Sequence, residues 1–163
     1  MGSLDLTAAF DVVNIDLLIK RLKNLGLPED WMELLAAWLR DRAAFVEVSA
    51  DRSILYEVNI GTVQGSILGP VLFSLFVSPI LEKTNIVAYA DDTYTITASK
   101  TKENAAAKLG KALTIITQWF KSSGLKVNKG KTEIAIFYKN NCNPGCNNFE
   151  GKVYSFLSYC NFN

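Results

Sequence analysis

The sequence contains no histidine, and its three cysteines, Cys142, Cys146 and Cys160, all lie near the C-terminal end. The absence of histidine excludes Ser-His-Asp and Cys-His catalysis and any His-ligated metal site. An odd number of cysteines, with no obvious fourth ligand for zinc, favours free thiols in a reducing compartment. Any catalysis or metal binding must therefore use other side chains.

No hydrophobic run is long enough to span a membrane comfortably. The most apolar run, residues 66–81, is short and contains Pro70 and Pro79, which favours a buried helix. A membrane-associated protein built on this run would need that helix to be exposed. The N-terminus shows no signal peptide, so we expect an intracellular protein that is not secreted and has no membrane partner, with the compartment undetermined.

Neither sign of charge is in excess, because 17 Lys and Arg face 16 Asp and Glu, for a formal net charge of +1. The balance hides a split: residues 1–100 hold 8 Lys and Arg against 13 Asp and Glu, whereas residues 101–163 hold 9 against 3. This asymmetry predicts an acidic face and a basic face, and the basic part could approach a nucleic-acid backbone. Two solvated surfaces without a partner would give the same counts, so the split alone assigns no function.

The 163 residues are enough for one domain with a core of useful size. Apolar residues recur at helical spacing in some segments and alternate with polar residues, or cluster as β-branched and aromatic residues, in others. The helical segments are 11–26, 28–39, 67–81 and 101–124, and the extended segments are 3–10, 43–60 (a hairpin that turns at Asp51-Arg52), 85–98 and 133–138. This mixture, without strict βαβ alternation, predicts an α+β fold: an antiparallel sheet with helices packed on one face.

Two of the helical segments have a distinct apolar side. The second helix carries Trp31, Leu34, Leu35, Trp38 and Leu39 on one face. In the fourth helix the predicted buried stripe runs through Ala106, Leu109, Leu113, Ile116 and Phe120. These positions follow the spacing of three and four residues that aligns side chains along a helix.

Two adjacent carboxylates, Asp91 and Asp92, interrupt the segment NIVAYADDTYTI, whose flanks both have strand character. Like charges so close together repel, and burial without partners is costly. A solvated turn is one interpretation, because Asp is a common turn residue. However, the flanks are apolar, and Asp5 ends a second short strand. Three carboxylates from two strand ends suit Mg²⁺, and a pair of such ions can hold the attacking and leaving oxygens of a phosphoryl transfer.

Four segments stand in order along the chain: DLTAAFD at 5–11, GTVQGSILGPVLF at 61–73, YADDT at 89–93 and GLKVNKGKTE at 124–133. Together they resemble the palm motifs of reverse transcriptases of the non-LTR retrotransposon type. Four ordered motifs are far more specific than one pair of aspartates. The resemblance implies a polymerase palm with a ferredoxin-like or RRM-like core. It also implies RNA-directed DNA polymerase activity, in which a two-metal nucleotidyl transfer adds dNTPs to the 3′-OH of a DNA primer on an RNA template.

The resemblance implies a role for each carboxylate of the first and third motifs. Asp5, Asp91 and Asp92 would be the catalytic ligands of two Mg²⁺ ions, or of Mn²⁺. The alternatives are a strand-end carboxylate for Asp5 and a solvated turn pair for the other two. Asp11 and Asp16 are interpreted as helix-start carboxylates.

The resemblance also implies residues that would contact the substrates. Phe10 would pack under the incoming sugar and exclude a 2′-hydroxyl, and Gln64 and Gly65 would line the pocket for the incoming nucleotide and the template base. Lys131 would act near the triphosphate as a charge partner or proton donor. The alternatives are a core aromatic, an ordinary helix-entry loop and a surface lysine.

Several parts of the family pattern have no counterpart in the sequence. Only three residues precede LDL, the chain ends soon after the fourth motif, and Val63 stands where the family has proline. We therefore interpret residues 1–140 as a palm domain whose fingers and thumb, largely missing, would come from a longer parent polypeptide. Residues 141–163 are interpreted as an irregular tail that either dangles or pairs as a weak edge strand. The alternative to a polymerase domain with impaired or no activity alone is a catalytically silent retroelement remnant that binds nucleic acid or protein at most.

Overall fold

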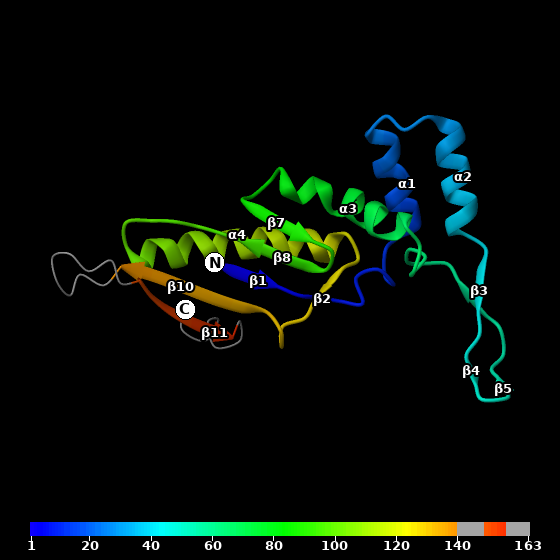
Figure 1. Ribbon diagram of the computed structural model, residues 1–163. Helices are drawn as coiled ribbons and strands as arrows, with labels where there is room; N and C mark the ends of the chain where they lie inside the picture. The colour runs from blue at the N-terminus through cyan, green and yellow to red at the C-terminus, as the bar shows by residue number, and fades with distance from the viewer. Residues whose placement is uncertain (140–148, 156–163) are drawn as a thin grey trace. The chain divides into compact units, whose positions relative to one another are not determined.

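The computed structural model describes residues 1–139 and 149–155, and the chain divides into two compact units (Figure 1). The sheet unit consists of Met1–Thr7, Ile80–Ser122 and the chain from Lys126 onward, and the helical unit consists of Ala8–Pro79 and Ser123–Leu125. Helices and antiparallel strands occur together, so the predicted α+β fold is confirmed. The three cysteines, and the parts of the predicted tail at 141–148 and 156–163, lie outside the described residues.

The sheet unit is built on one five-stranded antiparallel sheet with the order β11-β10-β1-β8-β7. Its elements are β1 (Gly2–Leu4), β2 (Leu6–Thr7), β7 (Ile86–Tyr89), β8 (Asp92–Thr95), α4 (Lys102–Ser122), β9 (Lys126–Val127), β10 (Glu133–Lys139) and β11 (Phe149–Ser155). The strand β1 is central, because it pairs with β8 on one side and with β10 on the other. A further short ladder joins β2 to β9.

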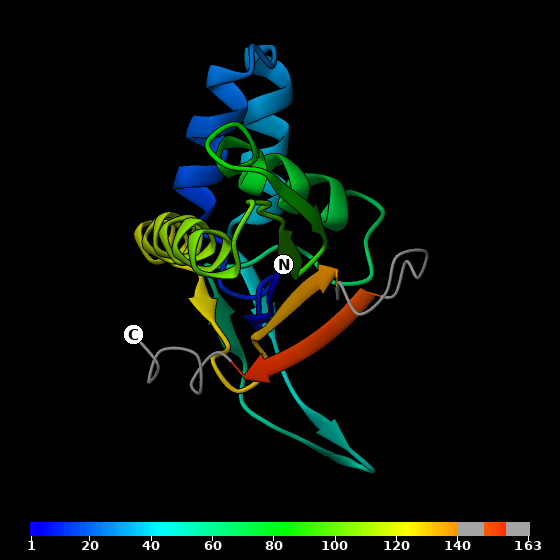
Figure 2. The same cartoon turned by 90° about the vertical axis from the view of Figure 1, so that its left-hand side faces the viewer.

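Helix α4 runs along one face of this sheet (Figures 1 and 2). A Cβ on Gly2 would lie 3.1 Å from Leu113 and 3.5 Å from Leu109, so β1 meets the helix with almost no space between them. Four of the five residues of the predicted stripe, from Leu109 to Phe120, are buried, as the helical spacing predicted. The buried face of the sheet includes Leu4, Thr93 and Thr95.

The helical unit begins with a pair of contacting helices. Its elements are α1 (Ile15–Asn24), α2 (Glu29–Leu39), β3 (Arg42–Ala44), β4 (Glu47–Val48), β5 (Asp51–Arg52), β6 (Tyr56–Val58) and α3 (Leu68–Leu81, whose last two residues belong to the sheet unit). The apolar face predicted for α2 is only partly the buried one, because Trp31 and Leu34 are 60% and 61% exposed, whereas Met32 and Leu39 are buried. Apolar residues occupy most sides of α2, so their spacing alone does not select the side that packs.

A half-buried arginine joins α1 to α3 inside the helical unit. The Arg21 guanidinium lies 4.2 Å from the centre of the Phe76 ring and donates hydrogen bonds to the Phe76 carbonyl and, at 2.8 Å, to Ser123 Oγ. Burial lowers the pKa of Arg21 from its usual value. The opposite side of α3 is exposed, and no described helix is both long and apolar enough to cross a membrane.

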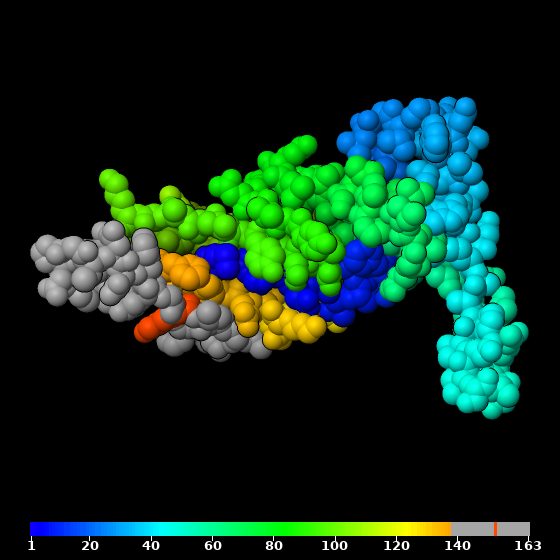
Figure 3. All heavy atoms as spheres, viewed as in Figure 1, coloured from blue at the N-terminus to red at the C-terminus, as the bar shows by residue number. Residues whose placement is uncertain are grey.

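Residues 42–58 form a two-stranded ribbon that projects from the helical unit (Figure 3). Ala44 pairs with Tyr56 and Glu47 with Arg52, so two residues of one strand face three of the other in a β-bulge. The predicted hairpin is present, but its turn lies at Ser49-Ala50 and not at Asp51-Arg52, because Val48 pairs with Asp51 and Ser49 adopts the positive φ that a tight turn needs. Large apolar side chains are exposed along the ribbon, at Phe45, Val46, Val48, Ile54, Leu55 and Tyr56.

Candidate active site

The paired aspartates lie at a two-residue hairpin turn between β7 and β8. Tyr89 pairs with Asp92, which leaves Ala90 and Asp91 as the loop. Ala90 has a φ of +52°, a conformation that costs a non-glycine residue roughly 1–2 kcal/mol. Positive φ at the first loop position is the pattern of a type II′ turn, which follows the right-handed twist of the flanking strands. Asp91 therefore stands at the tip and Asp92 opens β8.

The register between β1 and β8 brings Asp5 to the level of this turn. Ser3 pairs with Tyr94 and Leu4 with Thr93, so the next position, Asp5, continues toward Asp92. Leu4 and Thr93 belong to the buried face, and side chains alternate along a strand. The register and the alternation thus assign Asp5 and Asp92 to the face of the sheet opposite α4.

All three carboxylates are half-buried, and among the described residues none of them receives a hydrogen bond or an ion pair at its side chain. Within residues 1–139 and 149–155, no three Asp, Glu, His or Cys side chains gather closely enough to form a metal site as they stand. The backbone thus brings Asp5, Asp91 and Asp92 to the same end of the sheet, but their carboxylates do not form a closed set of ligands.

Lys131 lies on an exposed loop, and a main-chain hydrogen bond joins this loop to Asp5. The β2–β9 ladder pairs Leu6 with Val127, and the next donor, the Asn128 N–H, lies 2.8 Å from the Asp5 carbonyl. Lys131 N–H in turn donates to the Asn128 carbonyl at 3.2 Å. Lys131 was predicted from the sequence, whereas Asn128 was not. The available signal for Asn128 was Asn-Lys-Gly, a combination typical of turns.

Phe10 and Gln64 come together in the helical unit. The Phe10 and Phe73 rings lie 4.6 Å apart at an angle of 35°, and the Phe10 carbonyl accepts a hydrogen bond from Thr62 N–H at 2.8 Å. Gln64 Nε2 donates to a carboxylate oxygen of Asp11. Asp11 is therefore a partner of Gln64 and not a helix-start carboxylate, because α1 begins only at Ile15 with Asn14 as its N-cap. Asp16 does lie in the first turn of α1, where its carboxylate pairs with Arg40.

Gly61 and Arg42 fix the loop that precedes Gln64. Gly61 has a φ of +80° and donates to the Val13 carbonyl at 2.8 Å, and a Cβ at this position would lie 2.7 Å from the Asp11 carbonyl oxygen. Arg42 donates three hydrogen bonds of 2.7 Å, to the carbonyls of Leu39, Ile60 and Gly61. No sequence motif pointed to Arg42, because its partners are main-chain atoms.

Gly65 also has a positive φ, of +76°, but no atom beyond Gly65 and its two chain neighbours lies within 4 Å of the place where its Cβ would be.

The site residues predicted from the sequence fall into two groups. Asp5, Asp91, Asp92 and Lys131 belong to the sheet unit, and Phe10, Gln64 and Gly65 belong to the helical unit. Each group is assembled within its own unit.

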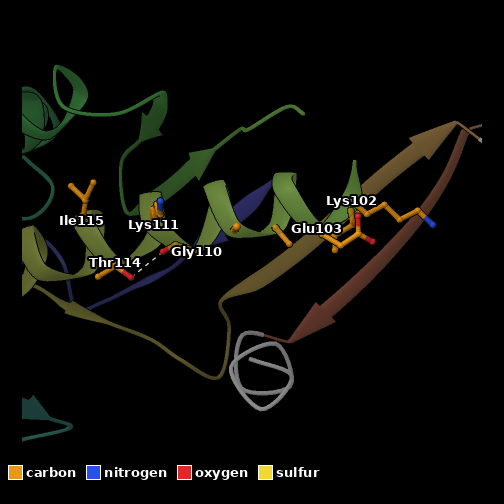
Figure 4. A pocket seen from close by; sticks show the side chains of 9 residues that line it. Lys102, Glu103, Gly110, Lys111, Thr114 and Ile115 are labelled. Atoms are coloured by element: carbon orange, nitrogen blue, oxygen red, sulfur yellow. Dashed lines mark hydrogen bonds between the residues drawn. The ribbon is translucent and has the colours of Figure 1, made fainter. Parts of the chain in front are cut away.

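A hollow of about 870 Å³ lies elsewhere in the sheet unit, along α4 and next to Ile136 of β10 (Figure 4). It is lined by Lys102, Glu103, Ala106, Ala107, Gly110, Lys111, Thr114, Ile115 and Ile136. The small residues Ala106, Ala107 and Gly110 leave space beside α4 here. Thr114 Oγ1 donates a hydrogen bond to the Gly110 carbonyl at 2.9 Å within the helix. None of the predicted site residues lines this hollow, so it is separate from the candidate active site.

An antiparallel sheet with a long helix on one face is the arrangement of a polymerase palm. Comparisons of the sequence agree with this class. Residues 1–159 match the family model described as reverse transcriptase (RNA-dependent DNA polymerase). The chain belongs to the reverse transcriptase family, and the predicted resemblance to non-LTR retrotransposon enzymes is confirmed.

Two similar proteins come from Drosophila melanogaster. The probable RNA-directed DNA polymerase from transposon BS is 34% identical over 79% of this chain and 15% of its own length. The RNA-directed DNA polymerase from mobile element jockey is 32% identical over 82% of this chain and 16% of its own length. The chain therefore spans less than a fifth of the length of these curated relatives.

Proposed function

We propose that this chain is the palm portion of an RNA-directed DNA polymerase that adds dNTPs to the 3′-OH of a DNA primer on an RNA template by two-metal nucleotidyl transfer. The observation that supports this proposal most strongly is the β1–β8 register. It brings Asp5 to the Asp91-Asp92 turn although the two segments are far apart in the sequence. Residues 1–140 would be the palm domain, with the remaining polymerase parts supplied by a longer parent polypeptide.

The chemistry of the three carboxylates suits Mg²⁺, or Mn²⁺ in its place. Asp5, Asp91 and Asp92 offer only oxygen donors and carry three negative charges without a cationic partner among the described residues. Bound metal ions would offset this repulsion, lower the pKa of the attacking hydroxyl and stabilise the leaving oxygen. The short Asp side chains would keep the ions close to the backbone.

The other residues would bind and position the substrates. In this proposal Phe10, supported from behind by Phe73, packs under the sugar of the incoming nucleotide and excludes a 2′-hydroxyl. Gln64, oriented by Asp11, and Gly65, open on its Cβ side, line the pocket for the nucleotide and the template base. Lys131 supplies positive charge, or a proton, near the triphosphate.

A catalytically silent remnant is the second candidate function. It is favoured by the carboxylates, which do not form a metal site as they stand within the described residues, and by the exposed apolar ribbon at 42–58. Such a chain would bind nucleic acid or protein at most.

Primer extension distinguishes the two candidates. The chain would be incubated with an RNA template, a DNA primer, dNTPs and either Mg²⁺ or Mn²⁺. The variants would be Asp91→Asn and, as a matched control, Asp51→Asn, which removes an exposed carboxylate from the ribbon. We expect the chain alone to be impaired, and any metal-dependent extension should fall by more than about 100-fold in Asp91→Asn, because a direct ligand contributes at least as much as an outer-shell partner. The control should retain it.

Equal extension by the wild type and Asp91→Asn would remove the polymerase assignment. Absence of extension, together with absence of Mn²⁺ binding by electron paramagnetic resonance, would favour the silent remnant. Mn²⁺ binding that depends on Asp5 and Asp91 without extension would support the metal site, and the missing activity would then lie in binding the primer and template.

A further inference from the structure

We propose that Asn128 is a positioning residue that couples the metal ligand Asp5 to the loop carrying Lys131. This inference rests on the proposed function, because it concerns the same metal site. Asn128 would touch neither metal nor substrate. It would act through the main chain of Asp5 on one side and through the turn that presents Lys131 on the other.

Asp5 stands where the chain leaves one ladder and enters another. Before it, Leu4 pairs with Thr93 of β8, and after it, Leu6 pairs with Val127 of β9. At the junction the Asp5 carbonyl accepts the Asn128 N–H at 2.8 Å. The peptide of Asn128 is therefore the contact that fixes Asp5 between the two ladders.

The same residue closes the turn that follows. Asn128 Oδ1 accepts the Gly130 N–H at 3.1 Å, and the Asn128 carbonyl accepts Lys131 N–H at 3.2 Å and Thr132 Oγ1 at 2.8 Å. Thr132 is fully buried. The hydrogen bond from its hydroxyl therefore connects the Asn128 carbonyl to a residue of the core. An Asn or Asp side chain that accepts a hydrogen bond from the main chain two residues ahead stabilises such a turn, whereas Ala cannot.

Loss of the Asn128 amide would therefore loosen the turn and the peptide that meets Asp5. A carboxylate ligand on a less fixed strand end binds metal more weakly, because more freedom is lost when the ion binds. Asn128→Asp keeps an acceptor oxygen at the same place. Rescue by Asp, which has nearly the same shape but no amide N–H₂, would therefore show that the turn needs the acceptor oxygen and not the amide donor.

The experiment measures Mn²⁺ affinity of the whole chain by electron paramagnetic resonance and thermal unfolding by circular dichroism. The variants are Asn128→Ala, Asn128→Asp and Asp5→Asn. The matched control is Asn14→Ala, because Asn14 Oδ1 accepts the Leu17 N–H at 2.8 Å and thus holds a comparable turn in the helical unit. Gly130→Pro is a second route, since it removes the donor to Asn128 Oδ1 while Asn128 stays intact.

We expect Asn128→Ala and Gly130→Pro to weaken Mn²⁺ binding about 10-fold, the lower end of the effect of outer-shell partners. Asn128→Asp should remain within about 3-fold of the wild type, and Asn14→Ala should bind Mn²⁺ unchanged even if it unfolds at lower temperature. Wild-type affinity in both Asn128→Ala and Gly130→Pro would overturn the inference. Equal weakening in Asn14→Ala would overturn it as well, because the effect would then be one of general stability. If Asp5→Asn binds Mn²⁺ as the wild type does, the proposed metal site itself fails, and the inference falls with it.

Discussion

Replacement of Gly61 by alanine should destabilise the helical unit strongly, for two reasons that the structure separates. The first is the backbone conformation, because a φ of +80° costs an L-residue roughly 1–2 kcal/mol. The second is contact: the new Cβ would lie 2.7 Å from the Asp11 carbonyl oxygen and 2.9 Å from two further main-chain atoms of Asp11. Backbone cannot move aside as a flexible side chain can, so overpacking adds about 1–3 kcal/mol. We expect Gly61→Ala to lower the free energy of unfolding by about 2–5 kcal/mol.

Gly65→Ala is the matched control, because Gly65 has nearly the same φ, +76°, but open space around its Cβ position. It should lose about 1 kcal/mol, since the conformational cost is partly offset by the lower entropy of the unfolded alanine chain. Urea unfolding followed by circular dichroism measures both variants. At about 2–4 °C per kcal/mol, Gly61→Ala should also melt several degrees below Gly65→Ala. Equal losses in the two variants would refute the contact with Asp11.

Three further substitutions test other parts of the structure by the same unfolding measurement. Arg42→Lys should lower the free energy of unfolding by about 2 kcal/mol, because an ammonium cannot satisfy three carbonyls that the guanidinium reaches at 2.7 Å each. An unchanged free energy of unfolding would mean that water replaces these hydrogen bonds. Arg21→Ala should lose about 2–3 kcal/mol, since it leaves the Phe76 carbonyl and Ser123 without their donor and removes the cation from the ring; Ser123→Ala should lose less. Ala90→Gly should stabilise by up to about 1 kcal/mol, because glycine accepts the positive φ of this turn; lower stability would show that the loop does not hold that conformation in solution.

The structure was predicted most reliably from the sequence where a pattern of apolar residues has a single physical explanation. The stripe on α4 is buried from Leu109 to Phe120, because its large apolar residues recur every three or four positions and polar residues fill most of the remaining helix surface. The strands around Asp91-Asp92 form the predicted hairpin, since β-branched and aromatic residues flank a turn on both sides. On α2 the apolar face read from the sequence includes the exposed Trp31 and Leu34, because a helix that is apolar on most sides does not reveal which side meets its neighbour.

For the candidate site, the sequence predicted which segments belong together but not the single contacts that support them. Order in the sequence indicated that Asp5 and the Asp91-Asp92 pair belong together, and their strands do pair in the structure. The supports were not predictable. Arg42 donates to main-chain carbonyls, and a main-chain partner leaves no signature in the residue types around it. Asn-Lys-Gly indicates a turn at Asn128, but not the hydrogen bond from this turn to the Asp5 carbonyl. Asp11 was assigned to a helix start from its position alone, whereas its partner Gln64 lies 53 residues further along the chain.

The central strand β1 has a consequence for how the protein folds. It is only three residues long, yet its partners β8 and β10 lie about 90 and 130 residues further along the chain. Closing a loop of about 90 residues costs on the order of 4 kcal/mol of chain entropy, beyond the cost of initiating the pairing. Local helices such as α1, α2 and α4 can form long before that cost is met, so β1 should join the sheet late and slowly. The acidic end of the sheet would then be among the last parts of the protein to exist, and a chain interrupted before β8 would contain Asp5 without the strand that gives it a place.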